Sequence, residues 1–203
     1  CSIRRLRWST ATRAGRSKLR SRSWWPIFRR TSPSFWRRAG SRGRGPSPSR
    51  PEVTEPLDWR EAPIGRHHDR KAFDCGSPEL NEYIDRYARQ NHESGGAKTF
   101  VAVPPAEPAR VLGYYSISPG AIEFAHVPAG ITKKLGRYEV PVFRLGRLAV
   151  SLTVQGRGLG GELLLAAGIR ALLVAAQIGG VALAIDAKDA RAARWYESFG
   201  AVQ

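Results

Sequence analysis

The stretch SLTVQGRGLGGELL, residues 151–164, has the spacing in this chain that most clearly indicates chemistry. Four of the six positions from Gly156 to Gly161 are glycine, and they stand between an apolar run and a segment with helical periodicity. Glycines let backbone N–H groups converge on an anion, and the start of a following helix adds positive potential. The loop therefore predicts a site for a phosphate-bearing molecule. A tight turn that uses glycine for packing would explain one or two of these residues, but hardly four.

Two glycine fingerprints overlap in this loop. Gly156, Gly158 and Gly161 fit the dinucleotide pattern G-x-G-x-x-G, and Asp186 ends the next predicted strand, where a ribose-binding acid is expected. Three features argue against this interpretation. Five residues separate the loop from the preceding strand, the loop comes late in the domain, and only 42 residues follow Gly161. So short a remainder cannot complete a doubly wound sheet.

The second fingerprint, Q-x-x-G-x-G, is formed by Gln155, Gly158 and Gly160. RLAV (147–150) precedes it on a predicted strand, and WYESFG (195–200) follows it. Upstream stand HDRKAFDCGSPELNEYIDRYARQN, GYYSISPG and PVFRLGRLAV. In these motifs the chain resembles the GCN5-related N-acetyltransferases, and among them the acetyltransferase toxins of bacterial toxin–antitoxin pairs. The matches cover about residues 57–202 and follow one another in the family's order.

The resemblance implies an α/β fold with a mixed sheet, the acyl-CoA N-acyltransferase fold, and acetyl-CoA as co-substrate without a metal. It implies direct attack of an amine on the thioester, with a backbone N–H of the strand at 148–150 stabilising the oxyanion. The matching tyrosine, Tyr196, would protonate the departing thiolate. The residues implied to bind the cofactor are Leu148, Ala149, Val150, Gln155, Gly156, Arg157, Gly158, Leu159, Gly160 and Gly161.

The resembling toxins acetylate the α-amine of aminoacyl-tRNA and so block translation. A polyanionic substrate requires a basic face, for which the candidates are Arg86, Arg89, Lys133, Lys134, Arg137 and Arg144. A cognate antitoxin is expected as partner, and a homodimer stays open. Three other interpretations also stay open: acetylation of a protein or small amine, a truncated inactive remnant, and RNA binding by the basic leader.

No convincing general base stands out in the sequence. We expect His67 and His68 at the surface or at the approach to a helix, and Cys75 as a small buried apolar residue. An α-amine needs little help from a base, because its pKa of about 7.7 leaves part of it neutral at pH 7.

The elements that must position these residues follow from periodicity and turn signals. We expect strands at 57–64, 98–104, 111–120, 121–128, 141–151 and 181–187. Helices are expected at 76–91, 160–177 and 189–200. In the first helix Leu80, Tyr83, Ile84 and Tyr87 recur at helical spacing and should form its buried face.

The positive charge is concentrated in a leader. Residues 1–50 hold 15 Arg and Lys and no acid, whereas the rest of the chain is nearly neutral although the net charge is +16. We expect residues 1–56, rich in Arg, Ser and Pro, to be disordered. The chain begins with Cys1 and has no Met, which favours a non-native leader over an RNA-gripping arm with stacking tryptophans.

The acetyltransferase domain is expected at 57–203, truncated at its C-terminus. The family continues after WYESFG with two more strands, so a chain that stops at Gln203 should leave a sheet edge unpaired. Two cysteines make no disulfide framework and suit a reducing compartment. The apolar run at 163–187 contains Arg170, which argues against a membrane span and for a cytoplasmic protein.

Overall fold

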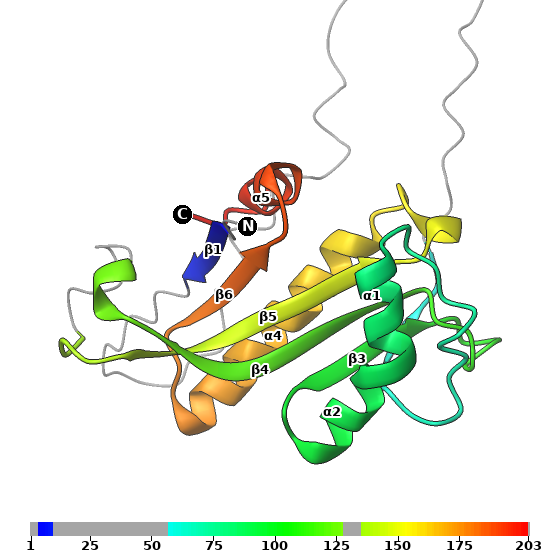
Figure 1. The fold of residues 1–203 in the computed structure, drawn as a ribbon, viewed down its shortest axis with the longest axis horizontal. Helices are drawn as coiled ribbons and strands as arrows, with labels where there is room; N and C mark the ends of the chain where they lie inside the picture. The colour runs from blue at the N-terminus through cyan, green and yellow to red at the C-terminus, as the bar shows by residue number, and fades with distance from the viewer. Residues whose placement is uncertain (1–3, 10–56, 128–134, 203) are drawn as a thin grey trace, which may run out of the picture. The chain divides into compact units, whose positions relative to one another are not determined.

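The protein, here as a computed structural model, is described at residues 4–9, 57–127 and 135–202, with Arg4–Ser9 described by backbone alone. Six strands form one sheet in the order β1-β6-β5-β4-β3-β2 (Figure 1). Neighbouring strands are antiparallel, except that β5 and β6 are parallel. The strands are β1 Arg4–Ser9, β2 Arg60–Pro63, β3 Lys98–Val103, β4 Gly113–Ile122, β5 Val140–Val150 and β6 Ala182–Ala187. This mixed sheet confirms the predicted fold class.

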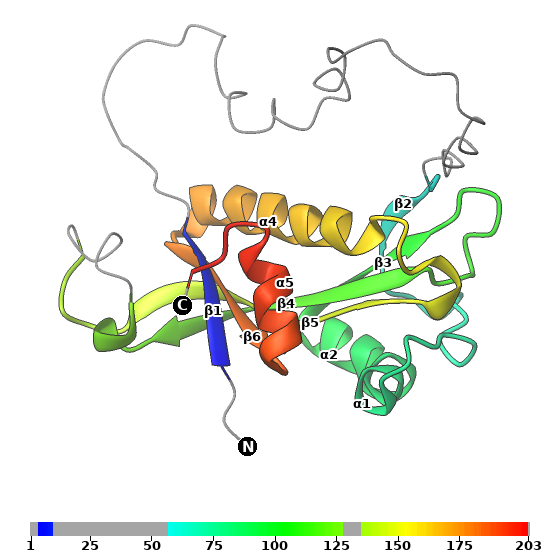
Figure 2. The ribbon, with the colours of Figure 1, turned by 90° about the horizontal axis from the view of Figure 1, so that it is seen from above.

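Helices cover both faces of the sheet (Figure 2). One face carries α4 (Leu159–Ile178) and α5 (Ala190–Glu197), and the opposite face carries α1 (Pro78–Glu82), the π-helix η2 (Tyr83–Tyr87) and α2 (Ala88–Ser94). Two single-turn 3-10 helices, η3 (Phe124–His126) and η4 (Leu152–Val154), follow β4 and β5. Because both faces are covered, the residues of β6 are buried nearly throughout rather than in alternation.

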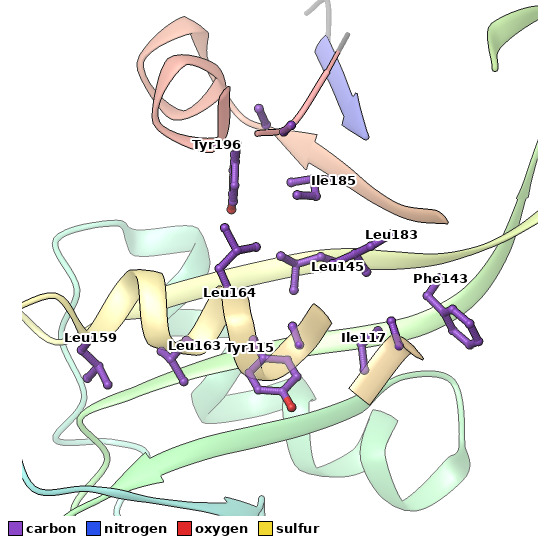
Figure 3. Close-up of a cluster of buried hydrophobic side chains, with 14 of the residues drawn as sticks. Tyr115, Ile117, Phe143, Leu145, Leu159, Leu163, Leu164, Leu183, Ile185 and Tyr196 are labelled. Carbon is purple, nitrogen blue, oxygen red and sulfur yellow. The ribbon is translucent and has the colours of Figure 1, made fainter. Parts of the chain in front are cut away.

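Each face has its own hydrophobic core. On the α4 face, Leu163, Leu164 and Ala167 pack against side chains of the central strands, among them Leu145 and Ile185 (Figure 3). On the α1–α2 face, the core is built from Tyr83, Ile84, Ala88, Val101, Val103 and Tyr114. The two cores hold the sheet between them and fix the end of β5, where the glycine loop begins.

Helix α4 is the longest apolar element of the described chain. By length and composition alone it could cross a membrane, with a mean hydropathy of 1.7 over 18 residues, but core helices of water-soluble domains meet the same criteria. Its one basic residue, Arg170, turns toward the sheet and donates to the Tyr115 hydroxyl at 2.9 Å. Arg170 also forms an ion pair with Glu61, which ties β2 to the helix.

The first helical segment differs from the prediction at Tyr87. Tyr83 and Ile84 are buried as expected, but Tyr87 is 48 % exposed and Ala88 takes the buried position instead. The cause is the π-helical turn of η2, which adds a residue to the turn and rotates everything after it. The strand predicted at 121–128 is also wrong, because β4 runs on to Ile122 and the 3-10 helix η3 follows.

The expected unpaired sheet edge is a further correction. Strand β1 pairs antiparallel with β6 over six residues, from Arg4 opposite Ala187 to Ser9 opposite Ala182. Residues 4–9 therefore form regular structure where the sequence predicted none, and they cover the edge beside β6. The rest of the predicted disordered leader, residues 10–56, lies outside the described residues, and the proposed domain boundary stays a prediction.

Candidate cofactor and catalytic site

The site begins where β5 and β6 part. The β4–β5 register shifts between Ser116 and Ile117, because Gly146 is an extra residue on β5. Such a bulge bends its strand, and the β5–β6 ladder is correspondingly short, covering only Phe143–Leu145 of β5. Figure 1 shows the two strands diverging beyond this ladder. The last residues of β5, 148–150, therefore face a gap and have no partner strand on that side.

The glycine loop closes one end of this gap. Gly156 and Gly158 have φ values of +78° and +88°, which side-chain-bearing residues rarely adopt. A Cβ on either would meet nothing within 4 Å, so both face open space. Gly158 immediately precedes α4, and its carbonyl accepts the N–H groups of Gly161 and Glu162. The N–H groups of Leu159 and Gly160 come before these bonds and have no acceptor within the helix, which is the arrangement expected for an anion site.

Gln155 holds this loop in place. Its side-chain amide donates to the carbonyl of Val150 at 2.9 Å and to the carbonyl of Cys75 at 3.1 Å. The glutamine of the Q-x-x-G-x-G motif therefore joins the end of β5 to the segment before α1. Its side-chain amide supports the loop geometry, and Gln155 also lines the cleft described next.

A cleft of about 660 Å³ joins the loop to α5, which is ample for a cofactor-sized ligand. Nine of the ten residues predicted to bind the cofactor line it; the tenth, Arg157, is exposed on the loop outside the lining. Sequence reasoning missed the part of the lining beyond β6, which comprises Lys188, Asp189, Arg191, Ala192, Trp195 and Phe199. Their position directly after the parallel strand β6 could have indicated them, because binding sites of α/β sheets lie at the carboxyl ends of parallel strands.

Aromatic residues of α5 and of the turn after it pack directly on the glycine pair. A Cβ at Gly160 would lie 3.3 Å from the Trp195 ring, and one at Gly161 would lie 2.9 Å from the Phe199 ring. The two glycines therefore allow α5 to approach the start of α4. Asp189 begins α5 by accepting the N–H of Ala192 at 2.7 Å. This packing holds the WYESFG motif and the glycine motif together.

Tyr196 lies on the inner side of α5 and lines the same cleft. Figure 3 shows its ring pointing from α5 toward Leu164 and the sheet. The residue is only 8 % exposed, and burial raises the pKa of its phenol to about 12. The phenol is therefore protonated at physiological pH, which is the form that a proton donor needs, and the raised pKa also makes it a weaker acid than an exposed tyrosine.

The residues considered as bases or nucleophiles are unsuited to either task. His68 is buried rather than at the surface, and its Nδ1 accepts the N–H of Gly65 at 2.9 Å. Burial lowers the pKa of His68, so its imidazole is neutral. Burial raises the pKa of the half-buried Cys75 thiol, which donates to Asn81 at 3.1 Å. A protonated, hydrogen-bonded thiol is a poor nucleophile.

Those basic residues predicted to meet tRNA that the structure describes lie on different elements of the fold. Three contact carboxylates: Arg86 with Glu82 at 3.1 Å, Arg89 with Glu93 at 2.7 Å, and Arg144 with Asp186. Arg137 is exposed, and Lys133 and Lys134 lie outside the described residues. Asp186, the acid of the rejected dinucleotide fingerprint, is thus engaged with Arg144. The described chain holds no group of three or more metal-ligating side chains, and a metal-free reaction stays a prediction.

No family model matches the chain. It is 35 % identical over 131 residues to the tRNA-acetylating toxin of Mycobacterium tuberculosis, covering 64 % of this chain and 76 % of that protein. It is 24 % identical over 156 residues to the probable toxin TacT of Sinorhizobium fredii, covering 73 % and 82 %.

Solved structures agree with these sequence relatives. AtaT complexed with acetyl-methionyl-tRNA superimposes with a TM-score of 0.67 at 25 % identity, covering 72 % of this chain and 89 % of that one. AtaTR bound with acetyl-CoA gives a TM-score of 0.62 at 26 % identity, covering 70 % and 85 %. With the cleft, the glycine loop and the buried tyrosine in place, the chain belongs to the family of tRNA-acetylating toxins, the acetyltransferase toxins of bacterial toxin–antitoxin systems.

Proposed function

We propose that this protein transfers an acetyl group from acetyl-CoA to the α-amine of an aminoacyl-tRNA. The observation that carries the proposal is the single cleft that joins the glycine loop, the free edge of β5 and Tyr196. Acetylation of this amine blocks translation. The reaction takes place where charged tRNA is found, in the cytoplasm, and a cognate antitoxin restrains it.

Different parts of the cleft bind CoA, stabilise the oxyanion and donate the proton. The loop from Gly156 to Gly161 and the first N–H groups of α4 hold the pyrophosphate of CoA, and the thioester lies along residues 148–150 of β5. A backbone N–H of this edge donates to the thioester oxygen and stabilises the charge that develops on it. The amine nitrogen attacks the carbonyl carbon, so that a C–N bond forms and the C–S bond breaks. Tyr196 gives its proton to the thiolate, the amine loses a proton to water, and the tyrosinate then takes a proton back from solvent.

The pH dependence follows from two pKa values. An α-amine near pKa 7.7 reacts as the free base, so we expect kcat/KM to rise about tenfold per pH unit below pH 7 and to level off above about pH 8.5. Tyr196 acts in its protonated form, and its raised pKa of about 12 means that this form is lost only as pH rises through 12. Initial rates measured from pH 6 to pH 10 should therefore show no alkaline decline caused by Tyr196. A decline centred below pH 9.5 that disappears in Tyr196→Phe would contradict this assignment.

Incorporation of labelled acetyl from acetyl-CoA tests the function itself. The substrates are a set of charged tRNAs, the same tRNAs without amino acid, free amino acids, a small polyamine and a lysine-rich protein. We expect label in one or more charged tRNAs and at least a hundredfold less in every other substrate. Formylmethionyl-tRNA is the matched control, because it is charged but has no free α-amine. Faster acetylation of the polyamine or the protein would overturn the proposed acceptor, although it would leave the acetyltransferase chemistry intact.

A further inference from the structure

Arg147 lies next to residues 148–150 of β5, where we place the thioester, but on the face of the sheet opposite α4 and α5. It comes directly before Leu148, the first β5 residue that lines the cleft, and is not itself part of that lining. Its guanidinium carbon lies 3.8 Å from the centroid of the Tyr83 ring, which belongs to η2. The bulge at Gly146 sets this orientation, because an extra residue reverses which face of the sheet the following side chains meet.

The ring beneath Arg147 is fixed by a buried network of hydroxyl groups. Tyr83 is 4 % exposed, and its hydroxyl hydrogen-bonds to Ser116 Oγ at 3.0 Å and contacts Thr99 Oγ1 at 3.5 Å. Thr99 in turn donates to Ser116 at 3.2 Å. These partners come from β3 and β4, so the ring is anchored to the centre of the sheet. A guanidinium stacked on such a ring is held in one orientation without any carboxylate.

The charge of Arg147 is not neutralised within the described part of the chain. None of the ion pairs there involves Arg147, whereas Arg86, Arg89 and Arg144 each contact a carboxylate. Arg147 is exposed, so solvent and a second substrate can reach its outer face. A fixed, exposed and unpaired guanidinium is suited to bind a phosphate through parallel hydrogen bonds.

We infer that Arg147 binds the phosphodiester that precedes the terminal adenosine of the charged tRNA, and so positions the α-amine at the gap between β5 and β6. This inference rests on the proposed function and extends it to a specific contact. About eight covalent bonds separate the α-amine from that phosphorus atom, a span of roughly 8 Å. An arginine side chain beside the oxyanion-binding strand covers a comparable distance. The glycine loop, on one side of the gap, binds the phosphates of CoA. Arg147 binds the acceptor tRNA.

Stable acceptor mimics test this contact directly. One is 3′-aminoacylamino-3′-deoxyadenosine, and the other carries a 5′-phosphate that is esterified to cytidine. We expect the wild-type protein to acetylate the phosphate-bearing mimic with a kcat/KM about ten- to a hundredfold higher. In Arg147→Gln this preference should fall to within twofold, because the rate with the phosphate-free mimic stays nearly unchanged. The dependence of kcat/KM for full-length charged tRNA on salt should also become less steep by about one unit of slope.

A matched variant and a CoA-binding control distinguish a loss of phosphate recognition from a folding defect. Arg110→Gln removes another exposed cation and should leave the preference unchanged, because Arg110 already contacts Glu107 at 3.9 Å and has no proposed role in binding. The affinity for CoA should stay the same in Arg147→Gln, which also verifies that the variant folds. Equal losses with both mimics, or a loss of CoA affinity, would overturn the assignment. Failure of the wild-type protein to acetylate either mimic or charged tRNA would instead refute the proposed function.

Discussion

Tyr196→Phe is expected to lower kcat for acetyl transfer by about 10²- to 10³-fold while the Kd for acetyl-CoA stays within twofold. The phenol is the one proton donor that we place beside the departing thiolate, and phenylalanine keeps the ring while removing the proton. Burial at 8 % exposure means that water cannot easily replace the hydroxyl. Single-turnover rates at saturating acetyl-CoA measure the first quantity, and calorimetric titration with CoA measures the second.

Tyr87→Phe is the control for this variant, because Tyr87 is a 48 % exposed tyrosine on the opposite face of the sheet. Its kcat should equal that of the wild-type protein. An unchanged kcat in Tyr196→Phe would show that the thiolate leaves unprotonated or takes its proton from water. A parallel loss of CoA affinity would assign Tyr196 to the wall of the cleft rather than to proton transfer.

Gly158→Val is expected to weaken CoA binding about a hundredfold. Valine is strongly disfavoured at the φ of +88° found here, so the loop must change conformation and its N–H groups lose their common direction. The strain itself should lower the free energy of unfolding by about 2 kcal/mol. Titration with CoA and urea unfolding measure the two effects separately.

Gly95→Val is the matched control for Gly158→Val, because the backbone conformation and the open surroundings are alike but the position is different. Gly95 has a φ of +83°, and a Cβ there would also meet nothing within 4 Å, but it follows α2 on the other face of the sheet. We expect the same loss of stability and an unchanged affinity for CoA. If both variants lose affinity equally, the effect of Gly158→Val is one of general stability, and the anion-binding role of the loop is wrong.

The parts of the site that lie on one segment could be predicted from the sequence. The glycine loop and Tyr196 belong to motifs whose spacing is local, and the strands beside them are apolar runs bounded by turn residues. In the structure Gly156 and Tyr196 line one cleft, and their roles stay predictions. The alternation at 121–128 misled the prediction, because a few apolar residues in alternation also fit the end of β4 followed by a 3-10 turn.

Features that depend on register could not be predicted in this way. The stacking of Arg147 on Tyr83 joins residues 64 positions apart and requires the bulge on β5. The Arg144–Asp186 pair depends on how β5 and β6 align. By contrast, the partners of Arg86 and Arg89 lie four residues away on the same helical segment, so helical spacing alone should have revealed them.

Strand β1 has a consequence for the order in which the chain is made. Its partner β6 is separated from it by more than 170 residues, so β1 has no partner during synthesis until β6 has also left the ribosome. Contacts of such long range form slowly, and the β6 edge is the last part of the sheet to be completed. Nascent chains are thus expected to close this edge only once β6 has emerged, and to expose β1 to other strands until then.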